Sequence, residues 1–119
     1  MLDARTEQLR ARTKVFAVRI VRLFRSLPPA IEAQVIGKQL LRCGTAVGAN
    51  YRAACRARSR AEFVSKIGIV TEEADESGFW IELLSDLGIM KKELLEDLLN
   101  ESRELTAIFS ASRQTAKQK

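Results

Sequence analysis

Residues 39–60, QLLRCGTAVGANYRAACRARSR, form a stretch whose composition changes along its length. It begins with leucines, continues through cysteine, glycine and alanine, and ends in a run of arginines. Small residues let a second helix approach closely, whereas arginines at the end of a helix present fixed hydrogen-bond donors to anions. The stretch therefore predicts a packing surface at one end and a binding surface at the other.

Apolar residues outside this stretch repeat at alternating steps of three and four, which is typical of helices packed in a bundle. Asp3 is a candidate N-cap, and Pro28–Pro29 ends the first helix. Ser59 and Glu62 fit a capping box, and Gly88 is a helix stop. The predicted helices cover residues 4–26, 30–57, 60–87 and 90–113. Short turns between helices of similar length predict an all-α, up-down-up-down antiparallel four-helix bundle, as one domain over residues 1–119.

The same periodicity predicts which side chains form the core. In the second helix the seam includes Asn50, whose buried amide is expected to fix the register of the bundle, with ligand contact as the alternative. Gly44 and Gly48 form a small-xxx-small motif, which we interpret as a packing device. The tail TAKQK is expected to fray. In the third helix the expected seam is Phe63, Ile67, Val70, Ala74, Ser77, Ile81 and Leu84. In the last helix the expected core residues are Leu94, Leu98, Leu105, Ile108 and Phe109.

Composition excludes several classes of protein. The longest uncharged run, Cys43–Tyr51, is nine residues, whereas a membrane span needs about 20, and the N-terminal segment does not resemble a signal peptide. We therefore expect a cytoplasmic protein. The chain has no histidine, which removes the commonest acid–base catalyst and metal ligand. We expect no catalytic residues, no metal and no cofactor. Cys43 and Cys55 are expected to be buried, reduced thiols rather than reactive ones.

Charge is unevenly distributed along the chain. Residues 1–70 hold 14 basic and 4 acidic residues, whereas residues 71–119 hold 6 basic and 11 acidic ones. An up-down bundle brings the start of the first helix, the turn before residue 60 and the end of the last helix to one pole. A pole rich in cations is typical of a nucleic-acid-binding protein. The candidate contacts are Arg52, Arg56, Arg58, Arg60, Lys66, Arg5, Arg10 and Arg12. The alternatives are a solvated basic face and a membrane-surface role for the first helix.

The acidic run around Asp75 could suggest a metal or catalytic site, but its register favours ion pairs between helices. Counting back from the turn places Asp75 level with Arg42, and Glu72 level with Arg12. We interpret these carboxylates as partners for arginines on neighbouring helices.

Three large apolar residues, Ile69, Phe79 and Trp80, are surplus to the core seam of the third helix. Surplus apolar surface on a bundle often marks a subunit interface. The alternative for Trp80 is stacking on a nucleic-acid base, which its place in the acidic half of the helix disfavours. We expect these residues to lie at a homo-oligomer interface.

Residues 39–84 closely resemble the bacterial four helix bundle protein family, through the TAVGAN segment, the CRARS turn, the EFVSKIGI segment and the EEADES–W–ELL segment. That family includes proteins encoded in intervening sequences of large-subunit ribosomal RNA genes. It also includes the accessory variability determinant (Avd) of diversity-generating retroelements. The resemblance implies a homopentamer of four-helix protomers. In the accessory branch it implies a basic surface that binds nucleic acid and a partner reverse transcriptase, which maps here onto Arg52, Arg56, Arg58, Arg60 and Lys66.

The sequence therefore predicts a non-enzymatic homo-oligomer that binds RNA or DNA with low sequence specificity. The alternative is a protein-interaction adaptor, in which the arginines dock an acidic partner such as a reverse transcriptase and contact with nucleic acid is incidental. An enzyme is a third and more distant hypothesis, because no group of residues satisfies the geometry of a catalytic site.

Overall fold

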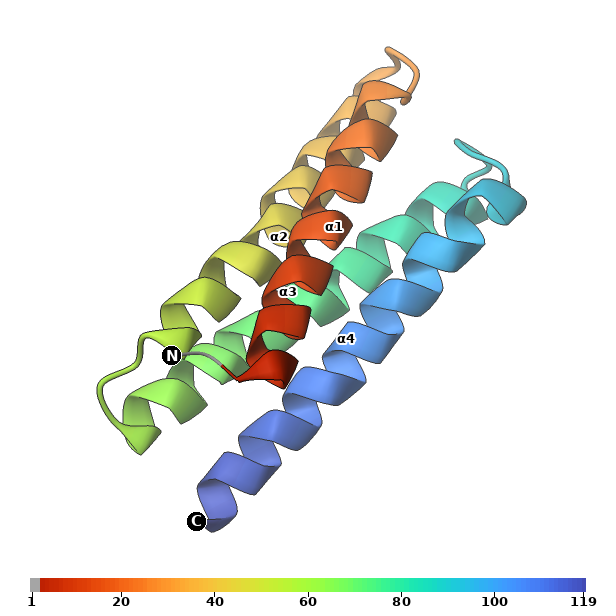
Figure 1. Cartoon of the computed structure of the whole chain (residues 1–119). Helices are drawn as coiled ribbons and strands as arrows, with labels where there is room; N and C mark the ends of the chain where they lie inside the picture. Colours follow the sequence, from red (N-terminus) through yellow and green to blue (C-terminus); the bar gives the residue numbers. More distant parts are fainter. Residues whose placement is uncertain (1–2) are drawn as a thin grey trace.

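The computed structural model describes residues 3–119, which form four antiparallel helices and no strand (Figure 1). The helices are α1 (Ala4–Arg25), α2 (Ile31–Cys55), α3 (Arg60–Asp86) and α4 (Lys92–Gln118). The predicted all-α bundle is confirmed, and it measures 47 × 23 × 22 Å. No helix within residues 3–119 is both long and apolar enough to cross a lipid bilayer.

The helix ends lie within two residues of the predictions, except at the C-terminus of α4. The predicted end at residue 113 was wrong, because α4 continues through the expected fraying tail to Gln118. No glycine or proline interrupts this segment, so nothing in the sequence stops the helix there. At the other end of the chain, Asp3 caps α1 as predicted, since its Oδ1 accepts the Thr6 N–H at 2.8 Å. Gly88 follows α3 with a φ of 67°, and the Ile89 N–H donates back to the Leu84 carbonyl, which is a Schellman stop.

The core combines apolar side chains from all four helices. Its fully buried members include Phe16, Ile20, Leu40, Val47, Ile67, Ile81, Leu105 and Phe109. Two predicted seam positions were wrong. Leu94 is 67% exposed and Leu95 is buried in its place. Asn50 is half-buried, and its Nδ2 donates to the Ala46 carbonyl of the same helix, so it does not fix register between helices. A straight helix turns every 3.6 residues, so a seam counted at 3.5 drifts off the core.

Helices α1 and α2 pack closely because α2 presents glycines to α1. A Cβ added to Gly44 would lie 2.7 Å from Cγ1 of Ile20, and one added to Gly48 would lie 3.4 Å from the Thr13 carbonyl oxygen. The packing role predicted for these two glycines is confirmed. Helices α1 and α4 approach each other less closely, and long charged side chains join them.

The ion pairs between helices differ in partner from the predictions. Arg12 pairs with Glu101 at 2.7 Å and Glu104 at 2.9 Å, both on α4, so the predicted partner Glu72 was wrong. A helix in a bundle has two neighbours, and residue counting alone does not choose between them. Arg42 does pair with α3, as expected, but through Glu73 and Glu76 and not through Asp75.

Candidate nucleic-acid interface

One end of the bundle gathers the start of α1, the α2–α3 turn and the end of α4 (Figure 1). This is the arrangement that the topology predicted. We call this end the basic pole. It contains the predicted cations Arg5, Arg10, Arg12, Arg52, Arg56, Arg58, Arg60 and Lys66. Within residues 3–119, Arg12 is the one member of this set that forms an ion pair.

The α2–α3 turn is fixed by hydrogen bonds from backbone N–H groups to the side chains of Ser59 and Glu62, which leave the arginine side chains of the turn exposed. Ser59 Oγ accepts the Glu62 N–H at 3.0 Å, and Glu62 Oε2 accepts the backbone N–H of Arg58 at 3.1 Å. The Glu62 carboxylate is thus held at the backbone and forms no ion pair with the Arg58 guanidinium. Arg60 is the first residue of α3, where the positive end of the helix dipole normally disfavours a cation. Dipole and arginines together raise the local positive potential, which suits an anion.

Two of the predicted cations meet in a cleft between three helices. Arg5 of α1 and Arg60 of α3 both line a cavity of about 520 Å³, whose far wall is the end of α4. Both side chains are exposed, and Asp3 is the one acidic residue among those that line the cavity. We call this cavity the polar cleft, a name that refers to its position at the basic pole and not to the polarity of its lining. Its lining residues are Asp3, Arg5, Arg60, Phe63, Ala111, Ser112, Thr115, Ala116 and Lys119.

A second group of cations borders a groove between α1 and α2. Arg10 and Lys14 from α1 and Arg52 from α2 line a cavity of about 230 Å³ whose floor includes Gly48 and Ala49. The surface of this groove is mostly apolar, and no carboxylate lines it. The Nε of Arg10 is buried and has no hydrogen-bond partner within the described residues. A buried donor without an acceptor is costly, but this Nε is closed to solvent, so an anion in the groove does not reach it in this conformation.

The remaining predicted cations are separate from these two cavities. Arg56 and Arg58 are exposed on the α2–α3 turn, and Lys66 is half-buried further along α3. Arg12 is committed to α4 through its pair with Glu101, which holds the pKa of that carboxyl below its usual range. We call the predicted cations that form no ion pair within the described residues the open cations. Arg12 is not one of them, because Glu101 and Glu104 already neutralise its charge.

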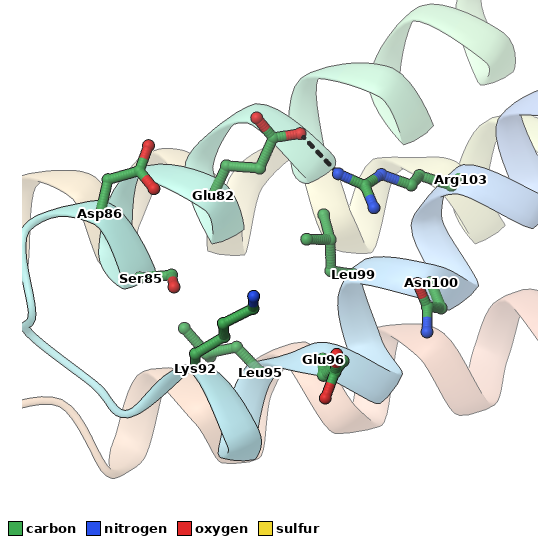
Figure 2. Close-up of a pocket in the computed structure, with 9 residues that line it drawn as sticks. All are labelled: Glu82, Ser85, Asp86, Lys92, Leu95, Glu96, Leu99, Asn100 and Arg103. Atoms are coloured by element: carbon green, nitrogen blue, oxygen red, sulfur yellow. Dashed lines mark hydrogen bonds and ion pairs between the residues drawn. The ribbon is translucent and has the colours of Figure 1, made fainter.

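The opposite end of the bundle also has a cavity, of about 380 Å³, between the end of α3 and the start of α4 (Figure 2). Its charges are mixed. Glu82 and Arg103 form an ion pair across it, with an N–O distance of 3.4 Å. Lys92 extends between the two helices, and Asp86 and Glu96 complete the charged lining. This second cleft carries three carboxylates against two cations, so it has no excess of positive charge.

The acidic run around Asp75 and the two cysteines are the candidate sites for a metal or a reactive thiol. No group of three or more His, Cys, Asp or Glu residues within 3–119 is arranged to hold a metal ion. Glu73 and Glu76 bind Arg42 instead. Cys43 is buried as predicted, whereas Cys55 is only half-buried. Burial raises the pKa of both thiols, which disfavours the reactive thiolate.

The predicted interface residues differ in exposure. Ile69 is 43% exposed and Phe79 is 55% exposed, so α3 does present apolar surface. Trp80 is half-buried, its Nε1 donates to Glu76 Oε2 at 3.0 Å, and its ring lies edge-on to Phe79. Val15 and Val18 are also exposed, on the outer side of α1, and were not predicted.

Sequence reasoning also missed two residues of the basic pole. Lys14 lies four residues after Arg10 and therefore on the same face of α1, a spacing that could have identified it. Phe63 was assigned to the core seam, and it does pack against the core while it also borders the polar cleft. Its second role depends on the end of α4, which the sequence placed five residues too early.

Comparison with known proteins places this arrangement in context. A family model described as 23S rRNA-intervening sequence protein matches residues 7–111. The fold is similar to that of a crystal structure from Bacteroides thetaiotaomicron, a protein of unknown function from the S23 ribosomal protein family. The two chains are 36% identical with a TM-score of 0.84, over 92% of this chain and 97% of the other. The search of curated proteins gives no match.

Proposed function

This chain belongs to the 23S rRNA-intervening sequence protein family, and we propose that it is a non-enzymatic, homo-oligomeric protein that binds nucleic acid, preferentially RNA, in the cytoplasm. The observation that carries the proposal is the basic pole. Cations from α1, α2 and α3 converge there, and within the described chain all except Arg12 lack a carboxylate partner. The family description associates these proteins with the genes of ribosomal RNA, which is the reason for proposing RNA before other polyanions.

In this proposal the open cations bind phosphates in two ways. Arg56 and Arg58 are exposed on the turn and make the first, long-range contacts with a polyanion. Arg10, Lys14 and Arg52 then hold a phosphate in the α1–α2 groove, where the small residues let the ligand approach the helix backbone. Phosphate contacts position a ligand without reading its bases, so sequence specificity is low.

Self-association would multiply this surface. The resemblance implies a pentamer, and the exposed Ile69 and Phe79 on α3 support an interface between copies. Several linked poles would bind one long polyanion by avidity, which raises affinity without any new contact.

The test is direct binding of purified protein to a labelled structured RNA and a matched duplex DNA, with the mass measured by light scattering in the same buffer. We expect an oligomer that binds both ligands, and RNA more tightly. An oligomer that binds neither at about 100 mM salt would contradict the proposal, because a set of open cations retains polyanion affinity there. That outcome would favour the adaptor function, with a protein such as a reverse transcriptase on the arginines.

A further inference from the structure

The polar cleft differs from the rest of the basic pole because it contains an aromatic side chain. Phe63 packs partly against the core and partly borders the cleft. Tyr51, the aromatic residue of α2 at this end, is only 5% exposed, and its ring lies 5.0 Å from that of Phe109. Phe63 is therefore the aromatic surface that a ligand at this pole can reach.

The α4 wall of the cleft is made of small side chains. Ala111, Ser112, Thr115 and Ala116 of α4 line the cavity together with Phe63. At about 520 Å³ the cavity lies within the range of about 300–1,000 Å³ that is typical of small-ligand pockets. Small side chains leave volume for a ligand, and the hydroxyls of Ser112 and Thr115 can donate hydrogen bonds to its polar atoms or accept them.

Three cations line the cleft together with Phe63: Arg5 of α1, Arg60 of α3 and Lys119 at the end of α4. None of them forms an ion pair within residues 3–119. Asp3 is the one acidic residue of the lining, and the Thr6 N–H lowers its pKa and keeps it charged, so the lining side chains carry a net positive charge. An aromatic platform beside guanidinium groups is the chemistry that recognises a base together with its phosphates.

From this juxtaposition we infer that the polar cleft binds an unpaired nucleotide, with the base stacked on Phe63 and the flanking phosphates on Arg5 and Arg60. The inference rests on the proposed function and narrows its ligand class to single-stranded segments or loops. A base inside a duplex is stacked on its neighbours and cannot enter the cleft. Duplexes bind through the exposed arginines alone.

The experiment compares a single-stranded RNA with a blunt duplex of equal length, using the intact protein. The variants are Phe63→Leu, which keeps apolar volume but loses the ring, and Phe63→Tyr, which keeps the ring. Phe24→Leu is the matched control, since Phe24, like Phe63, is partly buried against the core but lies at the opposite end of the bundle, near the end of α1. Thermal unfolding of each variant tests whether the fold is retained. If Phe63→Leu unfolds, Ala111→Leu, which fills the cleft from an exposed position on α4, takes its place with the same expected loss.

For Phe63→Leu we expect single-strand affinity to fall about tenfold, with duplex affinity unchanged. The salt slope should stay the same, because no charge is removed. Phe63→Tyr and Phe24→Leu should bind as the wild type does. Equal binding of the single strand by Phe63→Leu and wild type would overturn the inference while leaving the proposed function intact. Tighter binding of the duplex than of the single strand by the wild type would also overturn the inference. Failure of the wild type to bind either ligand would overturn both.

Discussion

The two ends of the bundle both have a cleft between helices, yet their charges give them different chemistry. At the basic pole, Arg5 and Arg60 line the cleft without ion pairs within the described chain. At the opposite end, Arg103 is paired with Glu82, and two further carboxylates oppose Lys92. The two clefts therefore differ in charge. What distinguishes the basic pole is that, within residues 3–119, all of its predicted cations except Arg12 lack an ion-pair partner.

The largest effect is expected from reversing charge on the α2–α3 turn. Arg56→Glu with Arg58→Glu should weaken RNA and DNA binding by on the order of tenfold to a hundredfold and lower the salt slope by about two. The side chains are exposed, so the fold should be unaffected. The matched control is Lys91→Glu with Lys92→Glu at the opposite end. Fluorescence anisotropy of labelled RNA and DNA measures the affinity of both double variants. Equal losses in the two double variants would remove the distinction between the ends.

A smaller effect is expected from single arginines, and it separates open cations from paired ones. Arg52→Gln should reduce the salt slope by about one and lower affinity several-fold, because Arg52 borders the α1–α2 groove. Arg12→Gln should leave the slope unchanged, since Glu101 and Glu104 already neutralise that charge. Titrations of both variants over the same salt series test this. A slope that falls more for Arg12→Gln than for Arg52→Gln would be evidence against the assignment.

The opposite end offers a gain-of-binding test. Asp86→Asn with Glu96→Lys would remove two carboxylates from the cleft in Figure 2 and add one cation. We expect duplex affinity to rise about two- to threefold, because added positive charge attracts the polyanion over a distance. Asp75→Asn with Glu72→Lys, at exposed positions elsewhere on α3, makes the same change in net charge and is the control. No gain over that control would mean that local charge is not the deciding difference.

The smallest effect concerns stability at acid pH. Hydrogen bonds from Arg12 lower the pKa of Glu101, so the folded protein gains stability above the ordinary value near 4.5 and loses it as the pH falls below. Urea unfolding at pH 7 and pH 3.5 should show a smaller acid loss for Glu101→Gln than for wild type. The difference should be under about 1 kcal/mol, because Arg12 is partly exposed. An identical loss in the two proteins would show that the pair adds no stability.

The fold was predictable because its signals are local. The spacing of apolar residues predicts four helices. Asp3 and Ser59 predict where α1 and α3 begin, and Gly88 predicts where α3 ends. The position of the basic pole followed from topology alone. Which side chains meet there was less predictable, because that depends on how each helix is rotated about its axis. Arg12 was assigned to the binding surface although it faces α4, and Phe63 was assigned to the core alone.

The most direct test of the central claim is the dependence of RNA affinity on salt concentration. If open cations of the basic pole bind phosphates, log affinity should fall linearly with log salt, with a slope of about three or more from the turn and groove arginines. The mass measured in parallel gives the number of poles that contribute. A slope near zero, or no binding of the RNA at about 100 mM salt, would contradict the account.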